Sequence, residues 1–274
     1  MALLENIQNN HTAFLETLKH RFLDDQRKSA LNKFFELGIP TKKDEEYRYT
    51  NLREITEKDY NFFPTEAHTI SKEQVAELHL GEENFDWIVF INGQLHKELS
   101  KISIENVEFL SFNFALNDAK HKEVFDNYFN TIAAKDLAFT NLNEAFCKHG
   151  FFLKVPKNMV IEKPIHVFYI SQNQQDNTFY NTRNLLIAEE GSKVEIIESH
   201  HNFDDTFVFT NSVTEIFTYQ NAKADWHKVQ NDSDTSYLMD HTFAKQERDS
   251  LTTVNTFTFG GKLVRNNLSF IHNG

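Results

Sequence analysis

The sequence predicts an α+β fold with a helical N-terminal region and a strand-rich C-terminal half. Over the first sixty residues, apolar side chains recur at spacings of three and four, as on one face of an amphipathic helix. From residue 151 onwards, short runs rich in β-branched and aromatic residues alternate with polar turns, which is typical of strands. A turn followed by an alternating strand recurs within that half, which favours a solenoid of stacked coils. A β-sandwich remains the alternative.

Two helices are expected at the start of the chain. The apolar stripe of the first consists of Leu3, Leu4, Ile7, Phe14, Leu15, Leu18 and Phe22. The second covers residues 30–37 and ends at Gly38-Ile39-Pro40, because glycine can adopt a left-handed cap and proline cannot continue the helix. Together they predict a helix hairpin. Residues 41–59 mix acidic and basic side chains and are expected to form a solvated surface.

The middle of the chain changes from helix to strand and back. A short helix is expected over residues 72–80. Residues 87–91 then run into Asn92-Gly93, which predicts a β-hairpin, because both residues accept the positive φ of a type I′ turn. Residues 117–149 predict a further helix that ends at Gly150.

The strands expected after Gly150 cover residues 151–155, 165–170, 185–187, 194–197, 207–209, 213–217, 224–226, 251–259 and 263–270. The recurring turn begins at Gly191, Asn221 and Gly260, which are 30 and 39 residues apart, so the period is irregular. Glycine is scarce in this half. Successive tight hairpins would need more of it, which again favours the solenoid. The 27 Phe of the chain are expected to fill the interior of the coils.

Composition excludes several classes of function. The 28 Lys and Arg against 40 Asp and Glu give a net charge of −12, which argues against nucleic acid or an anionic membrane as a partner. Cys147 is the one cysteine, so no disulfide can form within the chain, and a reducing compartment is expected. With no signal peptide pattern at residues 1–10, a cytoplasmic location is predicted. The spacing of the eight glycines excludes the P-loop, GxGxxG and GxSxG motifs.

Three groups of side chains are candidates for chemistry. The histidines of the strand-rich half are His200, His201, His227, His241 and His272. Stacked coils could bring His200 or His201 beside His227 as metal ligands, although unrelated surface histidines are the reading we favour. Cys147 and His149 form a Cys-x-His pair, for which a buried structural cysteine is the favoured alternative. The carboxylates near turns are Glu189, Glu190, Glu195, Glu198, Asp204, Asp205, Asp232 and Asp234, residue types that turns use anyway.

Two stretches resemble the SufB/SufD family of iron–sulfur cluster assembly proteins. The first is Gly38-Ile39-Pro40-Thr41-Lys42-Lys43-Asp44-Glu45-Glu46-Tyr47-Arg48-Tyr49-Thr50-Asn51-Leu52, in which Tyr47 stands where the family usually has Trp. The second comprises residues 139–145, 150–158 and 162–167. The opening of the chain and the Tyr49-Thr50 pattern with Leu52 look more like SufD than SufB.

The resemblance implies a helical region over residues 1–149, with a small hairpin, and the first part of a right-handed parallel β-helix over residues 150–274. It implies a non-catalytic scaffold that acts with a SufB-like paralogue and a SufC-like ATPase, in a complex that handles an iron–sulfur cluster and a reduced flavin. No catalytic, metal-ligating or cofactor-binding residue carries over to this sequence, and His272 is not the family's functional histidine by motif. A β-helix carbohydrate-active enzyme and a histidine-based metal-binding module remain the alternatives.

Family members continue well beyond the point that corresponds to Gly274. We therefore expect a chain shortened at its C-terminus, by engineering, by proteolysis or in a partial gene, that lacks the later coils and the helices that dock the ATPase. Such a chain should bind the ATPase poorly. A cut solenoid exposes an unpaired edge, so self-association through the open end is the other expectation.

Overall fold

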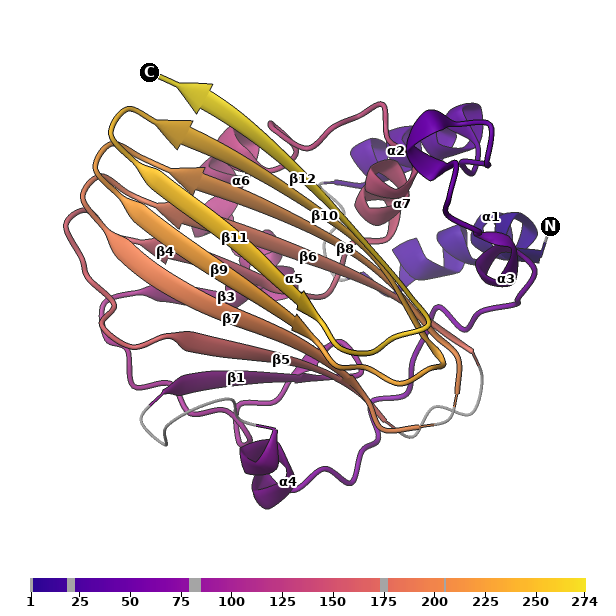
Figure 1. Cartoon of the computed structure of the whole chain (residues 1–274), viewed down its shortest axis with the longest axis horizontal. Helices are drawn as coiled ribbons and strands as arrows, with labels where there is room; N and C mark the ends of the chain where they lie inside the picture. The colour runs from indigo at the N-terminus through magenta and orange to yellow at the C-terminus, as the bar shows by residue number, and fades with distance from the viewer. Residues whose placement is uncertain (1, 19–22, 79–84, 173–176, 205) are drawn as a thin grey trace.

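Two six-stranded sheets face each other in the structure, a computed structural model that describes residues 2–18, 23–78, 85–172, 177–204 and 206–274 (Figure 1). The first sheet contains β1 (Asp86–Ile91), β2 (Gln94–Leu95), β5 (Ile165–Ser171), β7 (Lys193–Asn202), β9 (Lys223–Gln230) and β11 (Leu251–Thr258). The second contains β3 (Glu108–Ser111), β4 (Phe151–Val155), β6 (Thr178–Ala188), β8 (Val208–Thr218), β10 (Ser236–Glu247) and β12 (Leu263–Asn273).

From β4 onwards, successive strands alternate between the two sheets, and each pairs with the strand two places further along the chain. The first sheet runs in the order β11-β9-β7-β5-β1-β2 and the second in the order β12-β10-β8-β6-β4-β3. All neighbours from β4 onwards are parallel, whereas β2 and β3 add antiparallel edges. The expected α+β fold with a parallel β-helix is therefore confirmed. The β-hairpin at Asn92-Gly93, with φ of 50° and 82°, is confirmed as well.

One residue with positive φ marks the same corner of successive coils. These residues are Asn158 (60°), Gly191 (68°), Asn221 (58°) and Asp249 (58°). Two residues after each corner a strand or bridge begins, and these positions pair with one another: Val160 with Lys193, Lys193 with Lys223, and Lys223 with Leu251. The coil lengths are therefore 33, 30 and 28 residues, from 191 − 158, 221 − 191 and 249 − 221.

The position predicted for the third copy of the repeat, at Gly260, is wrong. Gly260 precedes β12 in the second sheet, whereas the corner that corresponds to Gly191 and Asn221 lies at Asp249. Asp249 was overlooked because asparagine and aspartate can replace glycine in the left-handed region. The coil period is therefore more regular than the sequence indicated.

Two strand predictions also need correction. The runs 207–209 and 213–217 form the single strand β8, and β10 was not predicted at all. Both strands carry polar residues on faces that are buried, such as Asn211 and Ser212 in β8 and Asp240 and Thr242 in β10. With both faces buried and polar groups on each, the alternation that identifies a half-exposed strand is lost.

Helices cover the outer face of the second sheet (Figure 1). They are α1 (Ala2–Glu16), α2 (Asp24–Leu37), α3 (Arg53–Thr56), α5 (Phe112–Asn117), α6 (Lys122–Tyr128) and α7 (Ala138–Phe146), with 3₁₀ turns η1 (Glu45–Tyr47) and η2 (Ala119–His121). The short helix α4 (Lys72–Glu77) instead packs on the outer face of β1 and β5. Within the described residues, none of the helices is both long and apolar enough to cross a membrane.

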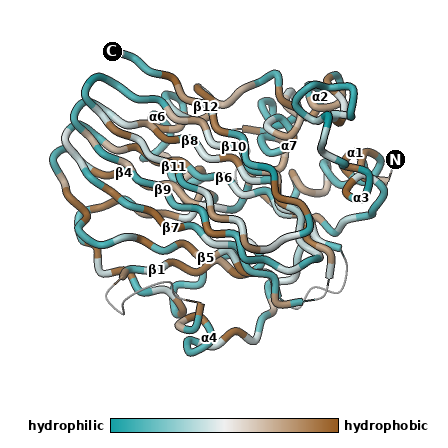
Figure 2. The backbone as a smooth tube through the Cα atoms, in the orientation of Figure 1, coloured by the Kyte–Doolittle hydropathy of each residue, from teal (hydrophilic) through white to brown (hydrophobic). Residues whose placement is uncertain are grey.

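The helix hairpin predicted for residues 3–37 does not form. The polar helix α2 packs mainly along α7, which comes about a hundred residues later, rather than along α1 (Figure 2). Phe22 and Leu80, which were assigned to the first helix and to the helix over residues 72–80, lie outside the described residues. The helix predicted over residues 117–149 is interrupted between α6 and α7, where Asn130 takes a φ of 61°.

Residues 41–59 are less solvated than expected. Their charged side chains are mostly exposed, but Tyr47, Leu52 and Ile55 are buried in the same cluster as α1 and α7. The Arg265 guanidinium of β12 lies 4.1 Å from the centroid of the Tyr47 ring, a cation–π contact. The N-terminal motif therefore touches the last strand of the second sheet.

Most buried phenylalanines lie between the second sheet and its helices, rather than inside the coils as predicted. The two clusters in that layer contain Phe14, Phe34, Phe62, Phe112, Phe125, Phe129, Phe139, Phe146, Phe152, Phe179, Phe207, Phe209 and Phe217. The interior cluster contains Phe90 and Phe151 among mainly aliphatic residues. Two facing sheets fill a narrow space with branched side chains, whereas a helix layer leaves wider gaps that rings can fill.

Gly150 should tolerate alanine much less well than Gly38. Both have positive φ, of 110° and 71°, so each Gly→Ala change strains the backbone. A β-carbon on Gly150 would also lie 2.2 Å from the Arg183 backbone oxygen. At Gly38, no heavy atom would lie within 4 Å of an added β-carbon. Gly150→Ala should therefore lower the free energy of unfolding by at least about 2 kcal/mol more than Gly38→Ala. Urea unfolding followed by circular dichroism measures both, and equal losses would contradict this close approach.

Candidate functional site

The interior of the solenoid is divided into an apolar half and a polar half. Alternate residues of each strand point inward. In β7 the inward side chains are, in order, Val194, Ile196, Glu198 and His200. The apolar half therefore lies where the strands of the first sheet begin, and the polar half lies where they end.

Glu198 is the centre of the polar half and is 1% exposed. Its Oε1 lies 2.9 Å from Nε2 of His200, and its Oε2 accepts a hydrogen bond of 3.0 Å from Nε1 of Trp226. Burial alone would raise the pKa of Glu198, but Lys228, His200 and Trp226 together hold it below its ordinary value. The carboxylate is therefore ionised inside the protein.

Lys228 supplies the cation of this interior. Its Nζ lies 2.7 and 2.6 Å from the two carboxylate oxygens of Asp240 and 2.8 Å from Oγ1 of Thr242. Lys228 and Asp240 are each 1% exposed, and they belong to β9 and β10, in opposite sheets. The ion pair therefore joins the two sheets across the interior.

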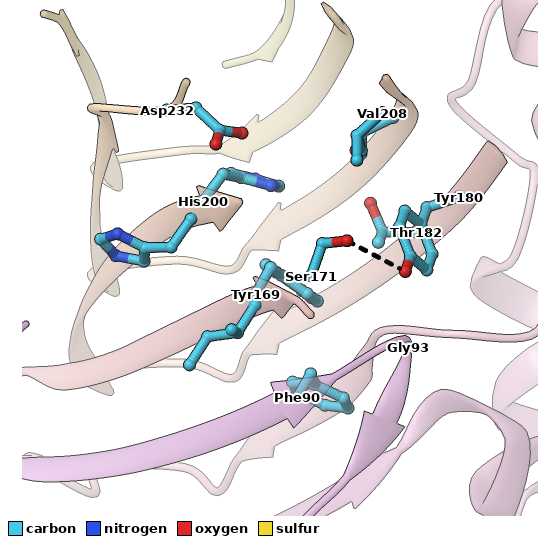
Figure 3. Close-up of a pocket in the computed structure, with 12 residues that line it drawn as sticks. Phe90, Gly93, Tyr169, Ser171, Tyr180, Thr182, His200, Val208 and Asp232 are labelled. Atoms are coloured by element: carbon cyan, nitrogen blue, oxygen red, sulfur yellow. Dashed lines mark hydrogen bonds between the residues drawn. The ribbon is translucent and has the colours of Figure 1, made fainter. Parts of the chain in front are cut away.

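A column of stacked rings and a small cavity lie beside this network (Figure 3). The ring of Tyr169 stacks on Phe90 at 5.2 Å and on His200 at 5.1 Å, between centroids, with interplanar angles of 20° in each case. The cavity, of about 30 Å³, is also lined by Ser171, Tyr180, Thr182 and Asp232. Ser171 and Tyr180 are joined by a hydrogen bond of 3.3 Å. A space of this size holds one or two water molecules, not a sugar chain.

These groups can hold protons and order water, but the described interior offers no room for a substrate of ordinary size. The Tyr169 hydroxyl donates to Oδ1 of Asn184 at 2.7 Å, and Nδ2 of Asn184 reaches Oε2 of Glu198 at 3.5 Å. Each charged group named here has a partner of opposite charge or a hydrogen-bond donor. The network is that of a satisfied polar core, which holds the two sheets in register.

The three histidines considered as metal ligands are not brought together. In the register of β7 and β9, His200 pairs with Gln230 and His227 pairs with Ile197. His200 points into the interior, whereas His227 lies on the outer face, with its Nε2 3.4 Å from Oε1 of Glu195. Nε2 of His201 contacts Oγ of Ser199 at 3.0 Å.

The other two candidate histidines belong to the second sheet. His241 is buried, and its Nε2 accepts from Nδ2 of Asn267 at 2.9 Å. His272 lies near the end of β12, beside Phe270, and is exposed. Neither approaches the pair of His200 and Glu198 closely enough for a shared ligand position within the described residues.

Cys147 is a buried structural residue, as the favoured reading held. Its thiol donates to the Glu144 carbonyl at 3.4 Å, and burial raises its pKa. The ring of His149 lies against Gly93 instead, and burial, with help from Lys148, lowers its pKa to about 4.

Two of the remaining carboxylates are in surface ion pairs. Glu189 lies 2.9 Å from Nζ of Lys154, and Glu190 lies 2.8 Å from Nζ of Lys157. Asp232 lines the cavity and accepts from the Ser233 backbone N–H at 2.9 Å. Asp204 and Asp234 lie in turns, and Asp205 is outside the described residues.

The sequence reading missed Lys228, Asp240, Asn184 and Tyr169. One signal was present, because Glu198 and Lys228 are separated by 228 − 198 = 30 residues, the length of the coil between Gly191 and Asn221. The register places Glu198 directly beside Lys228. Opposite charges one coil apart, at positions that alternate with apolar residues, therefore indicate an interior ion pair.

His241 should make the protein less stable in mild acid. Burial, followed by the charges of Arg265 and Lys228, lowers its pKa from the ordinary 6.5 to about 4. Between these two values the unfolded chain binds a proton that the folded chain does not, so stability falls as the pH falls from 6.5 towards 4. His241→Gln should therefore reduce the loss of unfolding free energy between pH 7 and pH 5 by about 2 kcal/mol. Urea unfolding at both pH values measures this loss, and equal losses in both proteins would contradict it.

Two family models match the chain in succession. The model of the SufBD protein N-terminal region matches residues 3–167, and that of the SufBD core domain of SUF system FeS cluster assembly matches residues 169–274. These matches cover the helical layer and the coils that hold the polar interior.

Curated proteins match over most of the chain. An iron–sulfur cluster assembly SufBD family protein of Synechocystis sp. is 25% identical over 264 residues, 93% of this chain and 58% of that protein. The chloroplastic protein ABCI7 of Arabidopsis thaliana is 24% identical over 254 residues, 88% of this chain and 51% of that protein. A SufBD family protein of Staphylococcus saprophyticus is 25% identical over 197 residues, 69% and 41% of the two chains. This chain thus spans about half the length of the curated relatives it matches.

Proposed function

Because the chain belongs to the SufBD family of iron–sulfur cluster assembly proteins, we propose that it acts as a SufD-like, non-catalytic scaffold subunit of a SUF-type assembly complex. The observation that carries this proposal is the polar interior, which joins two sheets through satisfied ion pairs and has space for only one or two waters. We propose a SufB-like paralogue and a SufC-like ATPase as its partners, and the cytoplasm as its location. The family matches favour this function over a carbohydrate-active enzyme or a histidine-based metal module.

The iron–sulfur cluster is the cargo of such a complex. Clusters are held by about four cysteine thiolates, whereas this chain has Cys147 alone, buried and directed at the Glu144 carbonyl. A cluster with four thiolate ligands would therefore need ligands from outside residues 1–274. The interior cavity of about 30 Å³ does not fit the ring system of a flavin either.

We divide the chain by role at residue 150. Residues 1–149 provide the helical cover, β1 and β2 of the first sheet and β3 of the second, and residues 150–274 provide the stacked coils. Under this division the N-terminal region also fixes the solenoid at both ends, because Tyr47 contacts Arg265 of β12.

The surface proposed for the paralogue is formed by the edge strands β11 and β12. Each is the last strand of its sheet within the described residues, so one side of its backbone has no strand partner there. Large apolar side chains are exposed on and beside these strands: Leu251, Phe257, Phe259, Leu268 and Ile271. Edge backbone next to exposed apolar groups is a template for adding strands from another chain.

Co-purification tests this proposal. The tagged chain is expressed with a SufB-like paralogue and a SufC-like ATPase, as wild type and as a Phe257→Lys/Leu268→Lys double variant. The amount of paralogue that co-purifies with the variant should be at least about tenfold lower than with the wild type, because lysine blocks strand pairing at an edge. The matched control is Ile102→Lys/Phe114→Lys, two exposed apolar residues that lie near β1 and β3, at the opposite end of the two sheets.

We expect the wild type to retain the paralogue. If neither partner is retained, or if the control variant loses as much paralogue as the edge variant, the proposal fails. Light scattering of the isolated chain shows whether a second copy occupies the edge instead, and a dimer that the edge variant abolishes would overturn the choice of the paralogue.

A further inference from the structure

Two histidines and a glutamate gather beside the β-hairpin of β1 and β2. His68 lies in the loop before α4, and His96 and Glu98 follow β2. One possible ligand atom from each of the three lies within 4.8 Å of the other two. Among the described residues, this is the group of three His, Cys, Asp or Glu side chains that is close enough to hold a metal ion.

The two imidazole rings leave nitrogen atoms without partners at this place. Nδ1 of His68 and Nε2 of His96 are both buried from solvent and make no hydrogen bond. The rings meet edge to face, with 4.4 Å between centroids and an interplanar angle of 83°. A buried imidazole nitrogen without a partner is costly, and a bound cation would satisfy both nitrogens at once.

The backbone next to His68 is held in place by Asn92, and that of His96 by Val89. Nδ2 of Asn92 donates to the carbonyl of Ala67, next to His68, at 3.2 Å and to the carbonyl of Gln172 at 2.8 Å. The His96 backbone N–H donates to the carbonyl of Val89 at 2.8 Å. The loop and the hairpin are therefore fixed relative to each other before any ion binds.

The third ligand lies beside the ring of His96 but faces its other nitrogen, so it must rotate to reach the ion. Oε1 of Glu98 lies 3.1 Å from Nδ1 of His96, and the Glu98 side chain is 68% exposed. Metal–ligand bonds of about 2.0–2.2 Å bring ligand atoms closer together than in the ion-free group, a contraction that rotation of the exposed glutamate can supply.

We propose that His68, His96 and Glu98 form a binding site for a divalent transition-metal ion. Two imidazoles and one carboxylate are the ligand set that suits zinc, with a fourth position open to water or to a ligand. The site is distinct from the polar interior and does not depend on the proposed scaffold role. Its place next to the hairpin would let the ion tie residue 68 to residues 96–98 across the surface of the first sheet.

Cobalt and zinc titrations of the full chain test the site. Co²⁺ should give a visible absorption band that saturates at one equivalent, and Zn²⁺ should displace it. His68→Gln and His96→Gln should each weaken Zn²⁺ binding by at least about 100-fold, since even partners of ligands contribute about 10–100-fold. Glu98→Gln should weaken it as well, and the far-ultraviolet circular dichroism of the ion-free variants should match the wild type.

The matched control is the His227→Gln/Glu195→Gln double variant. It removes a histidine and a glutamate on the outer face of the first sheet, whose Nε2 and Oε1 atoms are 3.4 Å apart. Within the part of the chain that the structure describes, no third ligand lies beside them. This variant should bind both ions as the wild type does, and Zn²⁺ should raise its melting temperature but not that of His68→Gln. Absence of a saturable band at one equivalent, or equal loss in the control and in His68→Gln, would overturn the proposal.

Discussion

Replacing Lys228 by methionine is expected to lower the free energy of unfolding by about 3–5 kcal/mol, because it leaves a carboxylate buried without its cation. Asp240 is 1% exposed and receives two short hydrogen bonds from Nζ of Lys228. Glu198 loses a cation too, since Lys228 helps to hold its pKa down. Methionine keeps the length and much of the volume of lysine, so the loss of stability reports the missing charge rather than missing packing. Urea unfolding at pH 7 measures the loss.

A second change should restore much of that stability. In Lys228→Met/Asp240→Leu both charges are replaced by apolar groups of similar size, which avoids an unpaired buried charge. Recovery should be incomplete, because Glu198 still lacks Lys228. Lys223→Met provides the matched control: its Nζ lies 2.8 Å from Oδ2 of Asp225, but the lysine side chain is 42% exposed. Its effect should be much smaller, and equal losses in Lys228→Met and Lys223→Met would refute a role for burial.

The sequence alone predicted the general form of the coils but not what lies between them. Regions of helix and strand were visible because their periodicity differs, and the Asn92-Gly93 turn was visible because few residue pairs accept its dihedral angles. The solenoid was favoured over the sandwich because glycine is scarce after residue 151, and the register confirms the repeat of 30 residues from Gly191 to Asn221.

What the sequence did not reveal has physical causes. β10 was missed because Asp240 and Thr242 occupy inward positions that the pattern assigns to apolar residues. The pairing of helices was wrong because α2 has a weak apolar stripe, and its partner α7 lies far away in the sequence. Such contacts depend on tertiary packing, which periodicity within one segment does not record.

The prediction of a metal site from the sequence failed for a related reason, because side-chain positions depend on tertiary structure. His200, His201 and His227 were grouped by spacing, but a shift of one residue in a strand moves a side chain to the opposite face, so the group separates. His68 and His96 were not grouped, because they come together only where a loop packs against a hairpin. Candidate ligands on strands therefore need the register as well as the period.

A second buried ion pair joins the helical layer to the second sheet, as Lys228 and Asp240 join the two sheets across the interior. Nη2 of Arg183 in β6 bonds to Oε2 of Glu215 in β8, and both side chains are 0% exposed. The guanidinium also donates to Oδ1 of Asn130 at 2.6 Å and lies 4.7 Å from the centroid of the Phe129 ring. The pair sits on the outer face of the second sheet, directly under the segment that interrupts the helix between α6 and α7.

Glu215 holds that segment by its backbone. Its Oε2 accepts from the N–H of Asn130 at 2.9 Å, and its Oε1 accepts from the N–H groups of Ile132 and Ala133, each at 3.3 Å. One carboxylate therefore satisfies three backbone donors that no helix satisfies. This arrangement explains why residues 117–149 do not form a continuous helix, although their apolar pattern permits one.

Glu215→Gln is expected to lower the free energy of unfolding by about 3–5 kcal/mol, because the Arg183 guanidinium is left buried without a counter-charge. The amide also offers one acceptor oxygen where the carboxylate offered two. Hydrogen exchange provides the local readout: the amides of residues 130, 132 and 133 should lose protection, whereas the His96 amide, which bonds to Val89 in the hairpin, should keep it relative to global unfolding. Unchanged protection of residues 130–133 would show that Glu215 is not what anchors the helical layer to the sheet.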